Sequence, residues 1–406
     1  MPKVFNSLAA DAAIAGCLSP TGDELPRLLQ QWQGPRPLMV CSGGTTSRCA
    51  AAQRWTLDLR STFQTLDLQA DHKTIRIGAG HSMGSVLDCL AGSGLTIATG
   101  LSRLPGMGFL LSGGVGPISR REGLAMDQLL EIRGVWGNGE PFALQRPCSE
   151  TNQPFDLRWR ALCGAAAFLA VVTDVTIKTL PLKPLWIRRN LIEASALPEW
   201  FAEAEAWSEQ RSLQWHWGPD DKIQMLEVSQ EPQPAAERID GLHQLPPLVE
   251  SPRPEQTIDS QRLHGEVFAL LGPAAAQQWQ KLLPDLQRLM RQRPHPGCSL
   301  AAQQIGGAIA KVPVETTSFV HRDAIWKPWI TAAWPVGDAL TRQISLDWAQ
   351  QLRGLLQSVC PGVHLAQLHD HLPCHEQELE QAFGPLLMPL RSLKARLDPN
   401  GNLPSL

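Results

Sequence analysis

The segment from Gly100 to Gly116 is the feature that most restricts how this chain can fold. Six glycines lie within it, and apolar residues separate them rather than the polar mix of a flexible linker. We therefore expect the segment to be packed inside the molecule, with its backbone pressed against something. Its spacing matches neither the Rossmann GxGxxG pattern nor the P-loop, which ends in GK[ST]. A nucleotide site built here would be of another kind.

A second glycine segment runs from Ser42 to Ser47 and follows the apolar run from Leu38 to Cys41. Glycine lets the backbone approach a ligand closely and adopt positive φ. Consecutive backbone N–H groups, joined by hydroxyl donors, can then form a concave site for an anion such as a pyrophosphate. Taken alone, the segment is better explained as an ordinary Gly-Gly turn with solvated hydroxyls, because short glycine motifs are weak evidence.

Bulk properties bound the class of protein. The 406 residues suffice for two domains, and with 43% hydrophobic and 18% charged residues they indicate a globular chain. The net charge of -3 gives no electrostatic reason to expect a nucleic acid or an anionic membrane as partner. The longest apolar run, Ala161 to Val172, is shorter than the roughly 20 residues that a membrane-spanning helix needs.

The cysteines and the N-terminus predict a cytoplasmic location. Nine cysteines occur at scattered spacings without a CxxC pair, a pattern typical of reduced thiols. The start of the chain does not resemble a signal peptide, because Asp11 interrupts its apolar stretch and Lys3 is its only early positive charge.

Hydrophobic periodicity predicts an α/β region followed by an α+β region. The first region has expected helices at 24–32 and 86–91, a helix-like piece at 124–130, and expected strands at 55–59, 74–80, 130–135 and 171–180. The paired prolines of residues 181–185 disfavour both helix and central strand and mark a boundary. Beyond it we expect strands at 212–217 and 222–228, an irregular stretch at 229–260, and helices at 273–293 and 345–359.

The order of motifs resembles the FAD-linked oxidoreductases of the vanillyl-alcohol oxidase and para-cresol methylhydroxylase type, and most closely those similar to berberine bridge enzyme. The family's first loop, R-S-G-G-H-S, corresponds to Cys41-Ser42-Gly43-Gly44-Thr45-Thr46. Its second loop, GG-x-G-x-x-S-R-x-x-G-L-x-x-D, corresponds to the stretch from Gly113 to Asp127.

Further matches extend nearly to the end of the chain. Asp156-Leu157 with Trp159 resembles the family's D-L-x-W segment, and Val172-Thr173 resembles the V-T strand that follows it. The T-x-F-x-H-R motif appears at Thr317 to Arg322, and the C-terminal F-G and D-P-x-N elements appear at Phe383-Gly384 and Asp398-Pro399-Asn400.

The resemblance implies an α+β fold, with a two-part α/β FAD-binding domain of the PCMH type and an α+β substrate domain that carries an antiparallel sheet. The expected domain boundaries are 1–182, 183–375 and a C-terminal segment, 376–406, that returns to the FAD-binding domain. The pyrophosphate of FAD would lie between the two glycine segments, and the flavin ring would face the sheet that roofs the substrate pocket. The implied cofactor-binding residues are Ser42, Gly43, Gly44, Thr45, Thr46, Ser47, Gly106, Gly108, Ser112, Gly113, Gly114, Gly116, Val172 and Asn400.

Two departures from the family concern the flavin. Many members attach FAD through a histidine in the first loop and a cysteine in the second, but here Thr45 takes the histidine position and no cysteine lies between Gly100 and Gly116. We therefore predict non-covalent FAD. The family's R-G-G-G-G stretch is Cys163 to Ala167 here, and each added methyl group narrows the approach to a ligand.

The catalytic base must also differ from that of many relatives, because the chain contains no tyrosine. A histidine or carboxylate is then the expected agent of any proton abstraction, and the candidates are His216, His369 and His371. On the strand Trp215-His216-Trp217, alternation places His216 on the face opposite to both tryptophans. The competing interpretation of His216 is a solvent-facing residue between two core tryptophans.

Three further groups of residues could suggest a functional site, but each also has a simpler interpretation. The cluster His364, His369, His371, Cys374 and His375 contains residue types that bind zinc, but its spacing fits no standard finger, so we expect no metal. His321-Arg322 is expected to brace the sheet or the domain interface. The tryptophans at 215, 217, 326, 329 and 334 are as consistent with a hydrophobic core as with an aromatic pocket.

The sequence thus predicts an FAD-dependent oxidoreductase that takes hydride from a small organic substrate to flavin N5 and is reoxidised by oxygen or another acceptor. The alternative is a binding or regulatory module on the same fold with a decayed flavin site, motivated by the alanines at 165–167 and the missing tyrosine. A structural metal protein is a third hypothesis that rests on the histidine cluster alone. The substrate and the oligomeric state stay open.

Overall fold

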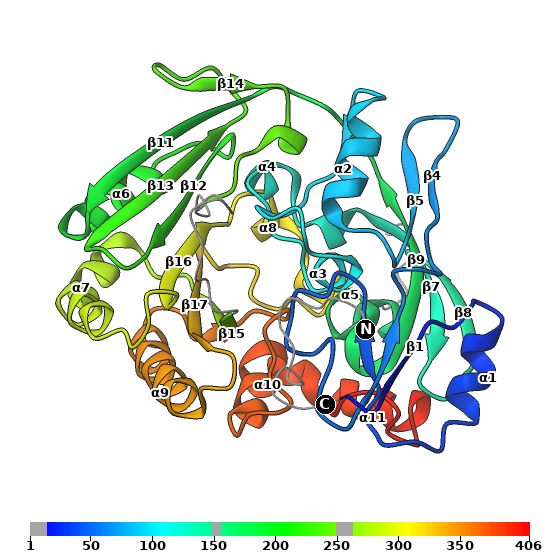
Figure 1. Ribbon diagram of the computed structural model, residues 1–406. Helices are drawn as coiled ribbons and strands as arrows, with labels where there is room; N and C mark the ends of the chain where they lie inside the picture. Colours follow the sequence, from blue (N-terminus) through cyan, green and yellow to red (C-terminus); the bar gives the residue numbers. More distant parts are fainter. Residues whose placement is uncertain (1–13, 148–155, 249–262) are drawn as a thin grey trace, which may run out of the picture.

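A computed structural model describes residues 14–147, 156–248 and 263–406 of the chain (Figure 1). The first part of the chain builds two sheets with short helices, and the second part builds one large sheet that helices cover on one face. This arrangement confirms the predicted α+β class. Within the described residues, no helix is long and apolar enough to cross a membrane.

A small parallel sheet carries the first glycine segment. Its strand order is β1 (Gly16–Leu18), β3 (Trp55–Asp58) and β2 (Met39–Cys41), and helix α1 (Glu24–Gln30) connects β1 to β2 in the chain. Both neighbours of β3 run parallel to it. Because β2 ends at Cys41, the chain leaves the sheet directly into Ser42 and Gly43.

An antiparallel sheet of five strands carries the rest of this first part. Its order is β4 (Leu66–Leu68), β5 (Thr74–Gly78), β9 (Ala170–Lys178), β7 (Leu129–Trp136) and β8 (Pro141–Gln145). The central strand β9 is rich in β-branched residues, which favour strand structure. Around the sheet lie α2 (Met83–Ala91), α3 (Met107–Leu111), α4 (Ser119–Glu122), the 3-10 turn η1 (Ala125–Gln128) and α5 (Leu157–Leu169), which bends at Cys163 and Gly164.

The large sheet has eight strands, all paired antiparallel. Their order is β14 (Glu237–Ile239), β11 (Leu185–Glu193), β13 (Lys222–Ser229), β12 (Arg211–Trp217), β16 (Ser299–Gln304), β17 (Trp326–Pro335), β15 (Leu263–Leu271) and β18 (Gly362–Val363). Helices α6 (Leu197–Glu205), α7 (Ala276–Arg291) and α9 (Ala339–Leu356) lie along its outer side in Figure 1.

The remaining elements are short or lie near the C-terminus. They are the two-stranded pair β6 (Leu95–Thr96) and β10 (Leu180–Pro181), η2 (Ala194–Ala196), η3 (Leu242–Gln244), α8 (Ala308–Lys311), η5 (Val314–Thr316), α10 (His375–Phe383), η6 (Gly384–Leu386) and α11 (Leu387–Leu397).

Strand β12 shows which way each face of the large sheet points. Trp215 and Trp217 are fully buried, and the Trp215 ring lies 5.9 Å from that of Phe201 on α6. On the other face, Ser212 donates a hydrogen bond of 2.6 Å to the carbonyl of Pro117, directly after the second glycine segment. The predicted alternation is therefore present: His216 shares the face that turns toward the first part of the chain.

The C-terminal segment contacts the first part of the chain. The Asn402 side-chain amide donates to the carbonyls of Leu29 and Gly137, each at 2.9 Å. Lys394 on α11 donates to the carbonyl of Phe168 at 2.8 Å. The predicted boundaries at 182 and 375 stay a prediction.

Arg322 braces the two parts of the chain, as the sequence suggested for His321-Arg322. Its guanidinium nitrogens lie 2.9 and 2.8 Å from the two carboxylate oxygens of Asp127, and both side chains are buried. Asp127 also accepts the backbone N–H of Leu124. The predicted helix-like piece at 124–130 is only the short turn η1, because strand β7 begins at Leu129, so that expectation is corrected.

Other elements also differ from their predicted extents, among them the helix expected at 345–359, which is α9 and begins at Ala339. The helix expected at 273–293 begins only at Ala276, because Gly272 pairs with Trp326 and extends the strand side of the connection. The stretch expected to be irregular, 229–260, contains β14, which pairs with β11, and the turn η3. Its residues 249–260 lie outside the described residues.

Candidate active site

The two glycine segments meet at their backbones. The Ser42 hydroxyl donates to the carbonyl of Ala79 at 2.6 Å and accepts the N–H of Met107 at 2.8 Å. A Cβ atom added to Gly43 would overlap the backbone nitrogen of Gly106, and one added to Gly106 would overlap Ser42 and Gly43. Neither position has room for a side chain, so glycine at both is a requirement of the close approach.

A cavity of about 340 Å³ opens beside this contact. Its volume lies at the lower end of the range of ligand pockets in proteins. Side chains and backbone of both glycine segments line it, together with the turn of α5 and the loop after β18. The apolar part of the wall comes from Val40, Leu59, Ala79, Pro105, Met107, Phe109, Leu111, Ala166, Phe168, Val172 and Leu365, among others.

Most of the predicted cofactor-binding residues lie together in this wall. Those that line the cavity are Ser42, Gly43, Gly44, Thr45, Thr46, Gly106, Gly108, Ser112 and Val172. The wall does not include Ser47, Gly113, Gly114, Gly116 or Asn400. Gly114 and Gly116 instead pack closely against Ala125 and the carbonyl of Thr99.

At the C-terminus, the buried asparagine is Asn402 and not the predicted Asn400, which is exposed. Asn402 is fully enclosed by its hydrogen bonds to the first part of the chain, so it holds the C-terminal segment in place. Asn400 does not line the cavity, and its contact with the cofactor stays a prediction.

The alanines that replace family glycines reach the cavity only in part. Ala166 and Ala167 line it, whereas Ala165 does not. Gly164, which precedes them, has a φ of 134° and lies where a Cβ atom would press on Ser318 and Leu365. Two extra methyl groups therefore stand in the wall, while the one position that needs positive φ keeps its glycine.

Sequence reasoning missed Arg48, which follows the first glycine segment directly. Arg48 lines the cavity, and its guanidinium carbon lies 5.4 Å from the centre of the Phe168 ring. Its buried Nη1 has no hydrogen-bond partner in the part of the chain that the structure describes. Burial lowers the pKa of this guanidinium, and the nearby carboxylate of Asp370 opposes the shift. The only signal in the sequence was a charged residue next to a run of hydroxyls.

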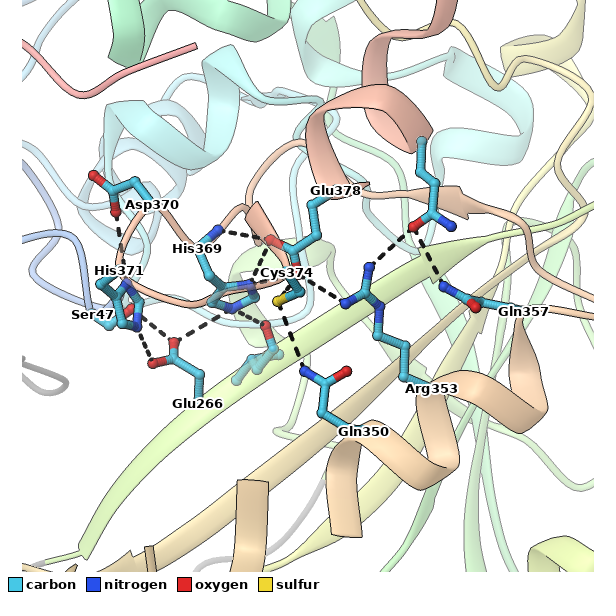
Figure 2. A network of polar contacts seen from close by, with 12 residues as sticks. Ser47, Glu266, Gln350, Arg353, Gln357, His369, Asp370, His371, Cys374 and Glu378 are labelled. Carbon is cyan, nitrogen blue, oxygen red and sulfur yellow. Dashed lines mark hydrogen bonds and ion pairs between the residues drawn. The ribbon is translucent and has the colours of Figure 1, made fainter. Parts of the chain in front are cut away.

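The predicted catalytic histidines His369 and His371 belong to a buried network behind the cavity wall (Figure 2). Glu266 on β15 accepts the Ser47 hydroxyl at 2.7 Å and lies 2.8 Å from Nε2 of His371. Glu378 on α10 lies 2.9 Å from Nδ1 of His369. Neither histidine lines the cavity, and the network ties the first glycine segment, through Ser47, to the large sheet.

Charge pairing controls the protonation of this network. Burial opposes a charge on His371, but the carboxylates of Asp370 and Glu266 outweigh it and raise the pKa of His371 from 6.5 to about 9. Burial likewise opposes a charge on Glu266, yet His371 and His369 hold the pKa of that carboxyl below its ordinary value. At neutral pH the pair is therefore a protonated imidazole and a carboxylate.

His216 lies apart from the other two candidates, on β12. It is partly buried and does not line the cavity. Burial, aided by the charge of Arg293, lowers the pKa of His216 to about 4. The structure thus does not bring the three predicted catalytic histidines together, and their catalytic role stays a prediction.

Within the described part of the chain, no three or more His, Cys, Asp or Glu side chains are arranged to hold a metal ion. Members of the histidine cluster have protein partners instead. His364 contacts Gln367, His369 contacts Glu378, and His375 contacts the carbonyl of Ser405.

Comparisons with known proteins agree with this geometry. Residues 24–145 match the sequence model of an FAD binding domain. An uncharacterized FAD-linked oxidoreductase, YgaK of Bacillus subtilis, is 24% identical over 335 residues, which is 74% of this chain and 70% of that protein.

Two solved structures have the same fold. BBE-like 1 of Physcomitrella patens superposes with a TM-score of 0.79 at 16% identity, over 99% of this chain and 92% of that one. Berberine bridge enzyme from Eschscholzia californica superposes with a TM-score of 0.76 at 17% identity, over 96% and 88%. The chain thus contains a segment similar to an FAD binding domain and has the fold of the berberine bridge enzyme-like proteins. The predicted resemblance and fold are confirmed.

Replacing Gly106 by alanine should destabilise the protein by about 1–3 kcal/mol, because the new methyl group forces the two glycine segments apart. The free energy of unfolding, measured with urea, checks the prediction. Gly354→Ala on α9 is the matched control, since a Cβ atom there meets nothing within 4 Å. Equal stabilities of the two variants would show that the segments do not touch.

Replacing His371 by glutamine should lower stability in a pH-dependent way. A folded-state pKa of about 9, above the ordinary 6.5, means that the contribution of protonated His371 is fully present below pH 6.5 and is lost as the pH rises through 9. The difference in unfolding free energy between the parent protein and His371→Gln should therefore shrink between pH 6.5 and 9.5. The exposed His72→Gln control should show a small, constant difference; a constant difference for His371→Gln contradicts the ion pair.

Proposed function

We propose that the chain binds FAD non-covalently in the cavity between the glycine segments and oxidises a small organic substrate. The observation that carries this proposal is the joint wall of the cavity: both glycine segments and the buried guanidinium of Arg48 face one space. When bound, FAD would accept hydride from a substrate C–H bond at N5 and pass the electrons to oxygen or another acceptor.

The residues present suit the cofactor. Nests of backbone N–H groups in glycine-rich turns bind anions, and hydroxyls of Thr45 and Thr46 add donors at the same wall. Arg48 adds a permanent positive charge with an unused N–H, which is the complement of a diphosphate. The apolar remainder of the wall, including Phe109 and Phe168, suits flat aromatic rings.

Threonine at position 45 cannot form the histidyl–flavin bond of many family members. This is the reason to propose non-covalent FAD. Thr45 lies in the cavity wall, where its hydroxyl can bind but cannot replace an imidazole nitrogen as the attacking atom.

Replacing Arg48 by methionine should weaken FAD binding by about 10- to 100-fold, because a charge-assisted hydrogen bond to an anion contributes roughly 1.5–3 kcal/mol. Fluorescence titration of the flavin-free protein with FAD measures the dissociation constant. The exposed Arg27→Met variant on α1 is the control and should bind FAD like the parent protein. Equal affinities of all three proteins would remove Arg48 from the cofactor site.

The purified protein should show flavin absorption bands and should release all its yellow colour into the supernatant on acid precipitation. Anaerobic photoreduction should bleach the bands, and re-exposure to air should restore them if oxygen is the acceptor. Flavin retained in the pellet contradicts non-covalent binding. A protein that is colourless and takes up no added FAD contradicts the proposed oxidoreductase.

The second candidate, a binding or regulatory module with a decayed flavin site, has one observation in its favour. The methyl groups of Ala166 and Ala167 stand in the cavity wall, where they reduce the room for a ring system. The same spectrum separates the two hypotheses, because a module without flavin stays colourless.

We also propose a cytoplasmic location and a small-molecule substrate as the only class of partner. All eight cysteines in the described residues are free thiols, as expected for a reducing compartment. The net charge of -3 gives no electrostatic reason to expect a nucleic acid as partner.

A further inference from the structure

A row of three polar side chains crosses the inner face of the large sheet. In the strand register, Gln214 on β12 stands directly opposite Gln303 on β16, and Gln303 stands opposite Lys327 on β17. Directly opposed residues share one face of a sheet. This is the face of Ser212, which bonds to the carbonyl of Pro117, so the row faces the FAD-binding part of the chain.

Each side chain of the row has a hydrogen-bonding group without a partner in the described part of the chain. Among the described residues, the buried Oε1 atom of Gln214 and Nε2 atom of Gln303 have no hydrogen-bond partner. Within the same residues, the Lys327 ammonium has no hydrogen bond or ion pair, and it lies 4.7 Å from the centroid of the Trp329 ring. The exposed fractions are 0% for Gln214, 2% for Gln303 and 8% for Lys327, so these side chains have little contact with solvent.

The neighbouring Gln304 shows that a buried glutamine in this strand can have hydrogen-bond partners for both of its amide atoms. It points to the opposite face, where its Oε1 accepts the N–H of Leu213 at 3.2 Å and its Nε2 donates to the carbonyl of Ala204 at 2.6 Å. Gln304 is 1% exposed, much like Gln303. The difference between the two is therefore the face on which they stand, and only the inner face leaves its amide unpaired.

His364 joins this row from the loop after β18. It is fully buried, and its Nδ1 lies 2.8 Å from Oε1 of Gln367, which lines the cofactor cavity. Its Nε2 has no partner among the described residues and lies 3.4 Å from the position that a Cβ atom of Gly113 would take. The ring thus lies beside the second glycine segment, and its partner Gln367 lines the cavity.

Burial lowers the pKa values of the two basic side chains, His364 and Lys327. Burial lowers the pKa of His364 well below its ordinary value, and the charge of Lys327 lowers it further, so the imidazole is neutral and Nε2 can accept a hydrogen bond. Burial also lowers the pKa of Lys327, to about 8, and no carboxylate offsets this shift. An anion next to the ammonium would restore its charge and remove the cost of leaving it unpaired.

A buried polar group without a hydrogen-bond partner destabilises the fold, and a buried ammonium without a counter-ion destabilises it more. Native proteins keep such groups rarely, and a ligand is one reason to keep them. Here four of them form one layer: Gln214, Gln303 and Lys327 on the sheet face that turns toward the first part of the chain, and His364, whose pKa the charge of Lys327 lowers. Together they offer one cation, one amide N–H donor and two hydrogen-bond acceptors to a ligand.

We propose that this layer binds the carboxylate of a small hydroxy acid, which is the substrate class of the proposed oxidoreductase. The inference rests on the proposed function. The carboxylate takes the Lys327 ammonium and the Nε2–H of Gln303, and hydroxyl groups of the substrate donate to Oε1 of Gln214 or Nε2 of His364. A neutral alcohol or an aliphatic amine would leave the ammonium unpaired, so both are disfavoured.

The test is binding of oxalate, a small dicarboxylate without a C–H bond to oxidise, measured by calorimetry on the FAD-loaded protein and on the flavin-free protein. Lys327→Met should weaken oxalate binding by about 10- to 100-fold, as expected for loss of a charged hydrogen-bond partner. Lys222→Met, on strand β13 of the same sheet with its side chain 53% exposed, should leave it unchanged. Unchanged oxalate binding by Lys327→Met, or no oxalate binding by the parent protein, overturns the proposal.

A pair of glutamine variants separates a binding role from a structural one. Gln303→Leu should weaken oxalate binding without loss of thermal stability, because its Nε2 has no partner to lose. Gln304→Leu should lower the stability, since it leaves Ala204 and Leu213 without their partner. If Gln303→Leu lowers the stability as much as Gln304→Leu and binds oxalate normally, the row is structural.

Two further outcomes distinguish this inference from the proposed function. A colourless protein that takes up no FAD but binds oxalate through Lys327 contradicts the oxidoreductase and, with it, the assignment of the carboxylate to a substrate. A yellow protein that does not bind oxalate keeps its flavin function and loses the hydroxy-acid class. Inorganic phosphate that binds more tightly than oxalate, with the same dependence on Lys327, replaces the carboxylate by a phosphoryl group and overturns the class.

Discussion

The backbone contact between the two glycine segments is the constraint on which the rest of the site depends. Ser42 bridges the carbonyl of Ala79 and the N–H of Met107, and Gly43 and Gly106 approach so closely that neither tolerates a Cβ atom. This contact joins the end of β2 to the start of α3. Because two segments separated by some 60 residues in the chain are brought together here, a cavity with walls from both can form. Helix α3, the turn of α5 and the C-terminal segment line the rest of the cavity.

Buried charges in this protein fall into two groups, and the difference separates support from binding. The pair of Arg322 with Asp127 connects the two parts of the chain, and the pair of His371 with Glu266 joins the loop after β18 to β15. Such pairs are costly to break from one side, which suits a structural role. Arg48 and Lys327, in contrast, have no ion-pair partner among the described residues; Arg48 lies at the cofactor cavity and Lys327 on the inner face of the large sheet. We interpret the second group as sites for anions.

Sequence reasoning reached the glycine segments and the strand alternation but misjudged single polar residues. Residues Ser42 to Thr46, predicted to bind the cofactor, line the cavity, because loop glycines act through their backbone, which a local motif specifies. His369 and His371 were singled out for their residue type, yet their carboxylate partners, Glu378 and Glu266, come from other elements, and Glu266 is over 100 residues away. The sequence contains no signal for that pairing. Arg48 and Lys327 were passed over because isolated basic residues usually face solvent.

The sequence by itself determined the class of the fold, the two glycine segments, the likeness to FAD-linked oxidoreductases and the opposite orientations of His216 and its neighbouring tryptophans. These features follow from local periodicity, from backbone freedom at glycine and from the order of motifs along the chain. Tertiary structure alone decided which polar groups are satisfied. Gln303 and Gln304 are adjacent and identical in type, but one amide is paired across the helix-covered face and the other is left for a ligand, because strand register and the packing of distant elements decide what each side chain meets.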